Sequence, residues 1–197
     1  MTTAVSFALT ATGYDAIAAL AGGFIPARIG GAALPPELWT VPAVLTPLSA
    51  TLIHAGILHL AVNMVMLGYV GRLTEDALGT RNLVLLYLVG AYAAAAAQAL
   101  PDMQSTVSMV GASGAISALV GASAMLYGKS RARAIGPIPE RVVHAAWLAV
   151  AWAAINWGMA VAFESGDSHL AWLAHVGGFL AGAALARPML RRRFGKL

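Results

Sequence analysis

The sequence predicts an all-α polytopic membrane protein, from its composition, the spacing of its charges and the distribution of its basic residues. Hydrophobic residues make up 59% of the 197 positions and charged residues only 10%, whereas about a quarter of the residues in a typical soluble domain are charged. The chain therefore lacks the polar surface of a soluble protein. We attribute its net charge of +4 to basic loops beside a membrane, and expect no nucleic acid partner. With no cysteine in the sequence, disulfides and thiolate chemistry are excluded.

Six segments are long enough to hold the roughly 20 apolar residues with which a helix crosses a bilayer. Five of them are free of Asp, Glu, Lys and Arg, and lie within 39–71, 82–101, 103–128, 142–163 and 168–186. The segment nearest the start of the sequence contains Asp15. Because a carboxylate is costly inside a membrane, we expect Asp15 to face the bundle or to lie near a helix end. The predicted helices, in a single membrane domain of residues 1–197, are about 3–23, 48–71, 82–100, 107–128, 142–163 and 169–187.

Six helices place both termini on one side of the membrane, and the basic residues indicate which side. Eleven of the twelve Lys and Arg residues fall on one face of this topology, and only Arg28 falls on the other. By the positive-inside rule we expect a multi-pass protein of a bacterial inner membrane, with both termini in the cytoplasm. The proline-rich segment 24–48 is then an outer cap, with Trp39 near the lipid headgroups. The second, fourth and sixth helices all run from the outside inward.

Three polar side chains on those parallel helices are expected at one level, roughly 10–15 Å below the outer helix ends. They are His59, Ser113 and His175. Strongly polar side chains are rare inside a bilayer and commonly mark function there. A serine hydroxyl needs a base to become a nucleophile, and histidine is the commonest one. We therefore predict a dyad of Ser113 and His175, with Gly114 and Gly178 allowing the two helices to approach closely. No third, acidic member is predicted.

Hydrolysis of an amide also needs hydrogen-bond donors directed at the developing oxyanion. His59 and Asn63 are four residues apart and share a helix face, whereas His54 is nine residues from Asn63 and points to about the opposite face. The spacing selects His59 and Asn63 as side-chain donors and gives His54 a structural or auxiliary role. The backbone N–H of Ser113 is a further donor if a helix begins near that residue.

Each of these residues also has an interpretation without catalysis. The stretch Gly111-Ala112-Ser113-Gly114 alone is typical of a packing surface between membrane helices, and a single His or Asn is typical of an interhelical hydrogen bond. The combination at one level favours an active site. A transporter, or a metal site of His54, His59 and His175, is disfavoured by the missing carboxylates and by the different faces of His54 and His59. We expect no metal and no cofactor.

The same residues carry a resemblance to a family. The patterns His54-x4-His59-x3-Asn63, Gly111-x-Ser113-Gly114 and Ala174-His175-x-Gly177-Gly178 resemble the signatures of the rhomboid intramembrane serine proteases. The resemblance extends over nearly the whole chain. It implies a six-transmembrane-helix rhomboid bundle, a Ser113–His175 dyad, and an oxyanion site of His59, Asn63 and the Ser113 amide. It also implies single-pass membrane proteins as substrates, cut near small residues where the helix is locally unstable.

An alternative within the family is a catalytically inactive rhomboid-like protein that binds transmembrane helices, which the presence of both Ser113 and His175 disfavours. Two positions depart from common family patterns. Trp39 is followed by Thr40 where members often have Arg. Ser117 stands where some members have an aromatic ring stacked on the catalytic histidine, so we expect His175 to be oriented by other contacts.

Access to the predicted site requires a gate, because water is scarce in a bilayer. The candidates are the outer loop 164–169 and the fifth helix, with Trp152 and Trp157 lining a lateral path between the second and fifth helices. Each tryptophan alone is also typical of a lipid-facing or core position.

Overall fold

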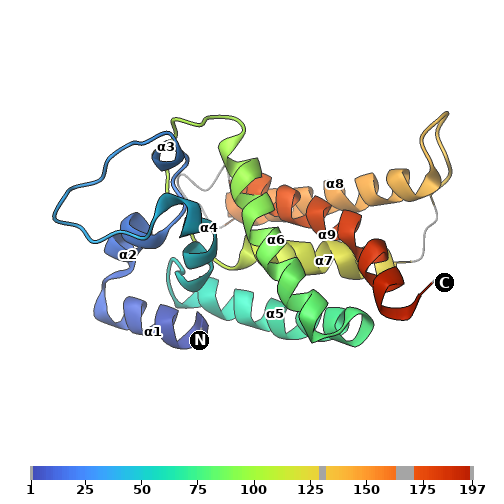
Figure 1. The fold of residues 1–197 in the computed structure, drawn as a ribbon, viewed down its shortest axis with the longest axis horizontal. Coiled ribbons are helices and arrows are strands. Elements are labelled where there is room, and N and C mark those ends of the chain that lie inside the picture. The colour runs from blue at the N-terminus through green and yellow to red at the C-terminus, as the bar shows by residue number, and fades with distance from the viewer. Residues whose placement is uncertain (1, 129–131, 163–170, 196–197) are drawn as a thin grey trace.

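A computed structural model describes residues 2–128, 132–162 and 171–195, and throughout these ranges the regular structure is helical (Figure 1). The predicted all-α class is therefore confirmed. The elements in chain order are α1 (Thr2–Thr12), α2 (Asp15–Gly22), α3 (Pro26–Ile29), η1 (Ala43–Leu45), α4 (Thr46–Ser49), η2 (Ala50–Leu52), α5 (Ile57–Leu78), α6 (Thr80–Ala99), α7 (Ser113–Tyr127), α8 (Glu140–Ala162) and α9 (Ala171–Phe194).

Within the residues that the structure describes, three helices are long and apolar enough to cross a bilayer. They are Ile57–Leu78, Thr80–Ala99 and Trp172–Phe194. Shorter apolar helical stretches lie at Ala43–Leu52, Ser113–Tyr127 and Val142–Ala154. Length and composition thus support an integral membrane protein, and the count of six crossings stays a prediction.

The first predicted helix, 3–23, is not continuous. Gly13 has φ +73, a left-handed conformation that interrupts a helix and that glycine adopts without steric cost. The chain therefore forms two short helices, α1 and α2. Asp15 is the first residue of α2, where a carboxylate interacts favourably with the helix dipole. Asp15 was expected either to face the bundle or to lie near a helix end, and it lies at a helix end.

The second predicted helix, 48–71, is displaced along the chain. Its expected start is occupied by α4 and η2, and α5 begins only after Gly56, which has φ +92. At the other end α5 continues beyond Gly71 to Leu78. Charged residues mark where a segment leaves the apolar layer rather than where its helix ends, which explains this error. His54 consequently precedes α5, so the argument that placed it on the opposite helix face does not apply.

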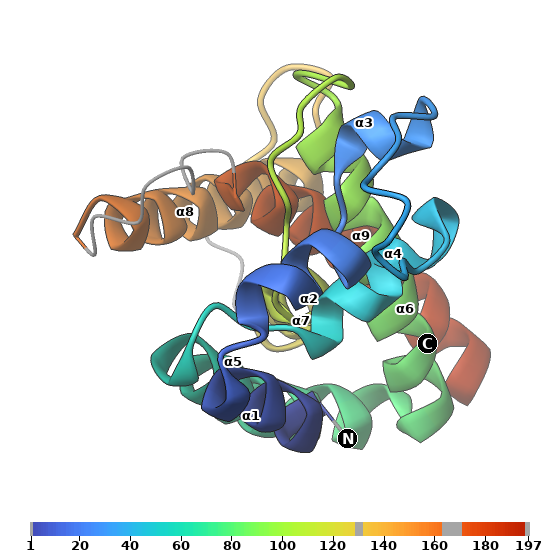
Figure 2. The ribbon, with the colours of Figure 1, turned by 90° about the vertical axis from the view of Figure 1, so that its left-hand side faces the viewer.

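The centre of the bundle is α7. It packs against α5, α6 and α9, and most of its residues are buried (Figures 1 and 2). Small residues permit this packing, because a Cβ on Gly178 of α9 would collide with the carbonyl oxygen of Gly114. Gly114 and Gly177 serve contacts with α6 instead, since a Cβ on Gly114 would collide with Ala94 and a Cβ on Gly177 with Ala97 and Ala93. The prediction for Gly114 is therefore wrong about which helix its missing side chain accommodates. The helix α8 lies at the edge of the bundle, where it packs on α9 and α7.

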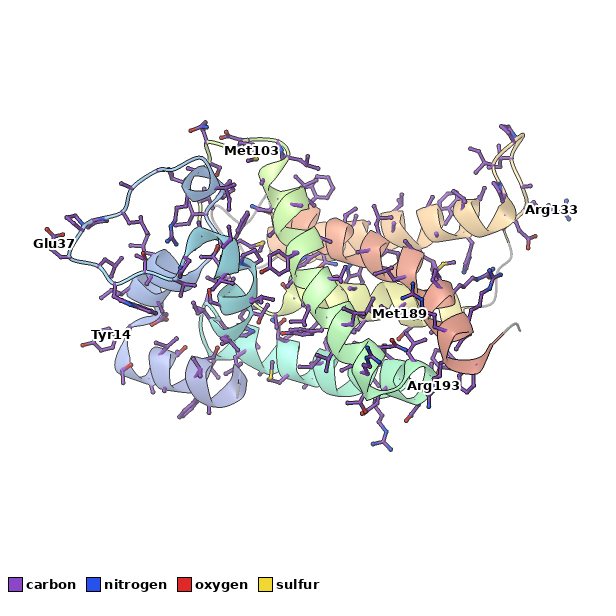
Figure 3. The ribbon with its side chains drawn as sticks, in the orientation of Figure 1. Tyr14, Glu37, Met103, Arg133, Met189 and Arg193 are labelled. Carbon is purple, nitrogen blue, oxygen red and sulfur yellow. The ribbon has the colours of Figure 1, made fainter. Side chains whose placement is uncertain are left out.

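The two ends of the bundle carry different side chains, and the predicted orientation in the membrane stays a prediction. Arg133 and Arg193 lie at one end, and Tyr14 and Glu37 lie at the other (Figure 3). The arginine end includes a specific contact, because Nη1 of Arg193 donates to the carbonyl oxygen of Asp76 at 3.1 Å, near the end of α5.

The loop at the opposite end is anchored despite the threonine after Trp39. Nη2 of Arg28 donates to the carbonyl oxygen of Val41 at 2.7 Å. The hydroxyl of Tyr92 in α6 donates to the carbonyl oxygen of Val44 at 3.1 Å. Arg28 thus holds the outer segment from a different sequence position.

Candidate active site

The turn that precedes Ser113 is fixed by backbone hydrogen bonds to the outer segments. Gly111 has φ +111, a backbone angle that residues with a side chain rarely adopt. Its amide donates to the carbonyl oxygen of Ala50 at 2.9 Å, and Met109 and Phe24 exchange two backbone hydrogen bonds of 2.8 and 3.0 Å. The turn is therefore held from two places far away in the sequence.

The helix α7 begins at Ser113, with Ala112 as its N-cap. The amide of Ile116 donates to the carbonyl oxygen of Ala112 at 2.9 Å. Because the C=O and N–H of a trans peptide point in opposite directions, this bond directs the amide of Ser113 out of the helix N-terminus. The condition set for the backbone N–H of Ser113 as an oxyanion donor is met.

Ser113 and His175 lie within hydrogen-bonding distance, 62 residues apart in the sequence. The distance from Oγ of Ser113 to Nε2 of His175 is 2.8 Å. In the part of the chain that the structure describes, the buried Nδ1 of His175 has no hydrogen-bond partner. A proton on Nδ1 leaves Nε2 free to accept the serine proton, as a general base does.

His59 of α5 and Ser113 both lie close to Gly111. Nδ1 of His59 accepts the amide hydrogen of Ala55 at 3.3 Å, so in the neutral ring the proton resides on Nε2. A Cβ built on Gly111 would lie 2.9 Å from that Nε2 and 3.7 Å from Oγ of Ser113. The missing side chain of Gly111 thus leaves a space between a serine oxygen and an imidazole N–H donor.

Asn63 lies one turn further along α5 and is 4% exposed. Its Nδ2 donates one hydrogen to the carbonyl oxygen of His59 at 2.8 Å. The amide therefore has one N–H left for another acceptor. The structure brings Ser113, His175 and His59 together, and it ties Asn63 to the turn of α5 that carries His59.

His54 is 1% exposed, and both of its ring nitrogens have partners. Nδ1 lies 2.7 Å from Oγ of Ser6 in α1, and Nε2 accepts the amide hydrogen of Ala112 at 3.3 Å. Its ring lies edge-on to that of His59, with the centroids 5.1 Å apart. These bonds leave His54 no free nitrogen for a metal ion, and they fit a structural role.

The common level in the membrane stays a prediction, but the three residues lie nearer to the starts of their helices than expected. Ser113 is the first residue of α7, His59 the third of α5 and His175 the fifth of α9. All three therefore lie at helix N-termini rather than roughly 10–15 Å below them. The positive end of the α7 dipole lies at Ser113, an arrangement that favours a developing negative charge.

Ser117 provides a contact that sequence reasoning missed. Its hydroxyl donates to the carbonyl oxygen of Ser113 at 2.8 Å and accepts a hydrogen from Nε1 of Trp152 at 3.1 Å. Trp152 thus ties α8 to α7 one turn below the dyad. No local pattern indicates this bond, because serine is common in membrane helices for packing reasons. The side chain of Trp157 and the loop 164–169 lie outside the described residues.

The comparisons with known proteins identify the family. The family model described as Rhomboid domain matches residues 37–192, from the outer loop to the end of α9. No curated protein matches the chain. The family match covers most of the chain and includes every residue of the candidate site. The chain therefore belongs to the rhomboid family of intramembrane proteases and their inactive homologues.

Proposed function

We propose that this protein is an intramembrane serine endopeptidase that hydrolyses peptide bonds in or near transmembrane segments of membrane proteins. The observation that carries the proposal is the 2.8 Å distance between Oγ of Ser113 and Nε2 of His175 at the start of α7. A nucleophile and its base within hydrogen-bond reach are the minimal requirement for acyl transfer through serine.

In the first step Oγ of Ser113 attacks the carbonyl carbon of the scissile peptide, and its proton moves to Nε2 of His175. The carbonyl π electrons move to the oxygen, which becomes an oxyanion. The amide of Ser113 and the Nε2–H of His59 are the proposed donors to this oxyanion, with Asn63 as a further donor through its remaining N–H. Such preorganised donors are often the largest single contribution to catalysis.

In the second step the C–N bond breaks, and His175 gives its proton to the leaving amine. The acyl group stays on Oγ of Ser113 as an ester. A water molecule, deprotonated by His175, then attacks the ester carbonyl and releases the carboxylic acid and the free serine. No cofactor takes part.

We place the site in the outer part of a bilayer crossed six times, with both termini in the cytoplasm of a bacterium. The joint position of Arg133 and Arg193 at one end of the bundle supports this orientation. Substrates enter between α5 and α8, with α8 and Trp152 as the gate. The family resemblance implies single-pass substrates with small residues near the cut.

The second candidate function, an inactive rhomboid that binds transmembrane helices, also fits the family. It predicts no requirement for the hydroxyl of Ser113 to approach an imidazole. The dyad distance therefore favours the protease.

The test compares wild type with Ser113→Ala in liposomes, using a model transmembrane substrate and a fluorophosphonate probe. We expect Ser113-dependent cleavage and labelling. His175→Ala should lose both, because the hydroxyl alone is a weak nucleophile. A wild-type protein that binds the substrate helix without cutting it or reacting with the probe supports the inactive homologue. Cleavage that survives Ser113→Ala, or that stops with a chelator, refutes the serine mechanism.

A further inference from the structure

The nucleophile's turn is connected to α1 by hydrogen bonds in series. Ser6 of α1 lies 2.7 Å from both the carbonyl oxygen of Leu52 and Nδ1 of His54. Nε2 of His54 accepts from the amide of Ala112 at 3.3 Å. Ala112 directly precedes Ser113, so the series runs from α1 to the peptide just before the one that carries the Ser113 N–H.

The chemistry of the groups fixes the direction of every bond in this series. A carbonyl oxygen only accepts, so the hydroxyl of Ser6 donates its hydrogen to Leu52. That hydroxyl can then only accept from His54, which places a proton on Nδ1. A backbone amide only donates, which leaves Nε2 of His54 unprotonated. His54 is therefore neutral, in a single tautomer, and Ser6 selects it.

The three linked groups are among the most buried in the chain. The exposed fractions are 0% for Ser6, 1% for His54 and 0% for Ala112. An unpaired polar group at such a buried site is destabilising, so each bond depends on its neighbour. Removing the hydroxyl of Ser6 leaves the Nδ1–H of His54 without that acceptor, so the ring loses one of the two hydrogen bonds that hold Nε2 at the amide of Ala112.

The end of the series bears on catalysis. The amide of Ala112 belongs to the peptide before the one that carries the Ser113 N–H. A rotation of that turn moves both Oγ of Ser113 and the proposed oxyanion donor. Gly111 and Met109 are held independently through Ala50 and Phe24, so the series to α1 controls the last residue before the nucleophile.

We propose that Ser6 is a positioning residue, which acts through His54 to orient the Ala112–Ser113 peptide for catalysis. This inference rests on the proposed protease function. It assigns α1 a part in the reaction that neither its short length nor its sequence indicates.

The test combines kinetics with nitrogen NMR of histidine. We expect Ser6→Ala to lower kcat by on the order of 10- to 100-fold, as small misplacements of a reacting group do, with KM nearly unchanged. Ser6→Thr, which keeps the hydroxyl, should retain most of the activity. Thr12→Ala is the matched control, because its hydroxyl bonds only to Ala8 and Leu9 within α1, and we expect it to be fully active. In a His54→Gln background, Ser6→Ala should cause no further loss.

The NMR arm does not depend on activity. The NMR signals of His54 are assigned by their disappearance in His54→Gln. We expect them to show the proton on Nδ1 in the wild type. We expect Ser6→Ala to speed hydrogen exchange at the Ala112 amide. A proton on Nε2 in wild type overturns the series, and so does a kcat of Ser6→Ala equal to that of Thr12→Ala. Absence of Ser113-dependent cleavage refutes the proposed function instead, and the nitrogen shifts and amide exchange still decide whether Ser6 orients the turn.

Discussion

The space beside Gly111 makes the strongest prediction about the candidate site. In Gly111→Ala the new Cβ would lie 2.7 Å from Cε1 of His59, against about 3.4 Å for an ordinary contact. The ring must therefore move by about 0.7 Å, the difference between these two distances. Oxyanion donors act at about 2.7–3.1 Å, and a displacement near 1 Å costs roughly 100-fold in rate. We expect kcat to fall by about that factor.

Backbone strain must be separated from this displacement. The φ of +111 at Gly111 is unfavourable for alanine, by about 1–2 kcal/mol of folding stability. Gly31→Ala is the matched control, because Gly31 has φ +93 and no atom within 4 Å of the built Cβ. It should lose similar stability and keep its activity. Cleavage is measured in liposomes and unfolding in detergent. If folded Gly111→Ala cleaves as fast as Gly31→Ala, the space between His59 and Ser113 is not the oxyanion site.

Three further predictions concern contacts between helices of the bundle. Gly178→Ala places a Cβ against the carbonyl oxygen of Gly114, so α9 must shift; we expect cleavage to fall at least tenfold and the midpoint of thermal unfolding to drop, and unchanged cleavage would leave Gly178 a simple packing residue. Trp152→Phe and Ser117→Ala each remove the same hydrogen bond and should each cost about 0.5–1.5 kcal/mol of stability, and additive losses in the double variant would contradict a direct bond. Arg193→Ala removes the donor to the end of α5 and should cost about 0.3–1 kcal/mol with normal cleavage, so a loss of activity would connect that end to the site.

The helices were predictable where composition alone determines them. The apolar run after Thr80 appears as α6 (Thr80–Ala99), almost as expected for 82–100. The breaks at Gly13 and Gly56 were not predictable in the same way. A positive φ is required there by the tertiary path of the chain, and glycines elsewhere in the sequence, such as Gly90, lie inside helices.

The candidate dyad was predictable because polar side chains are costly in an apolar chain, so the few that occur concentrate at a site. The direction of each hydrogen bond was not. His54 has its role through Ser6 and Ala112, 48 and 58 residues away in the sequence, and no spacing rule connects such partners. The same holds for Trp152, whose indole reaches Ser117 from a helix that packs at the edge of the bundle.

The late start of α7 bears on how the proposed hydrolytic site could work at this position. Its 15 residues extend about 22 Å, which is less than the roughly 30 Å of a hydrocarbon layer. If α7 ends at the cytoplasmic boundary, Ser113 lies about 8 Å inside the outer one, and the chain above it is irregular. Irregular backbone is tolerated at that depth only where protein buries it or water reaches it. Hydrogen bonds to the buried residues Phe24, Ala50 and His54 hold this backbone inside the protein, and the N-terminus of α7 directs the amide of Ser113 out of the helix at the proposed site.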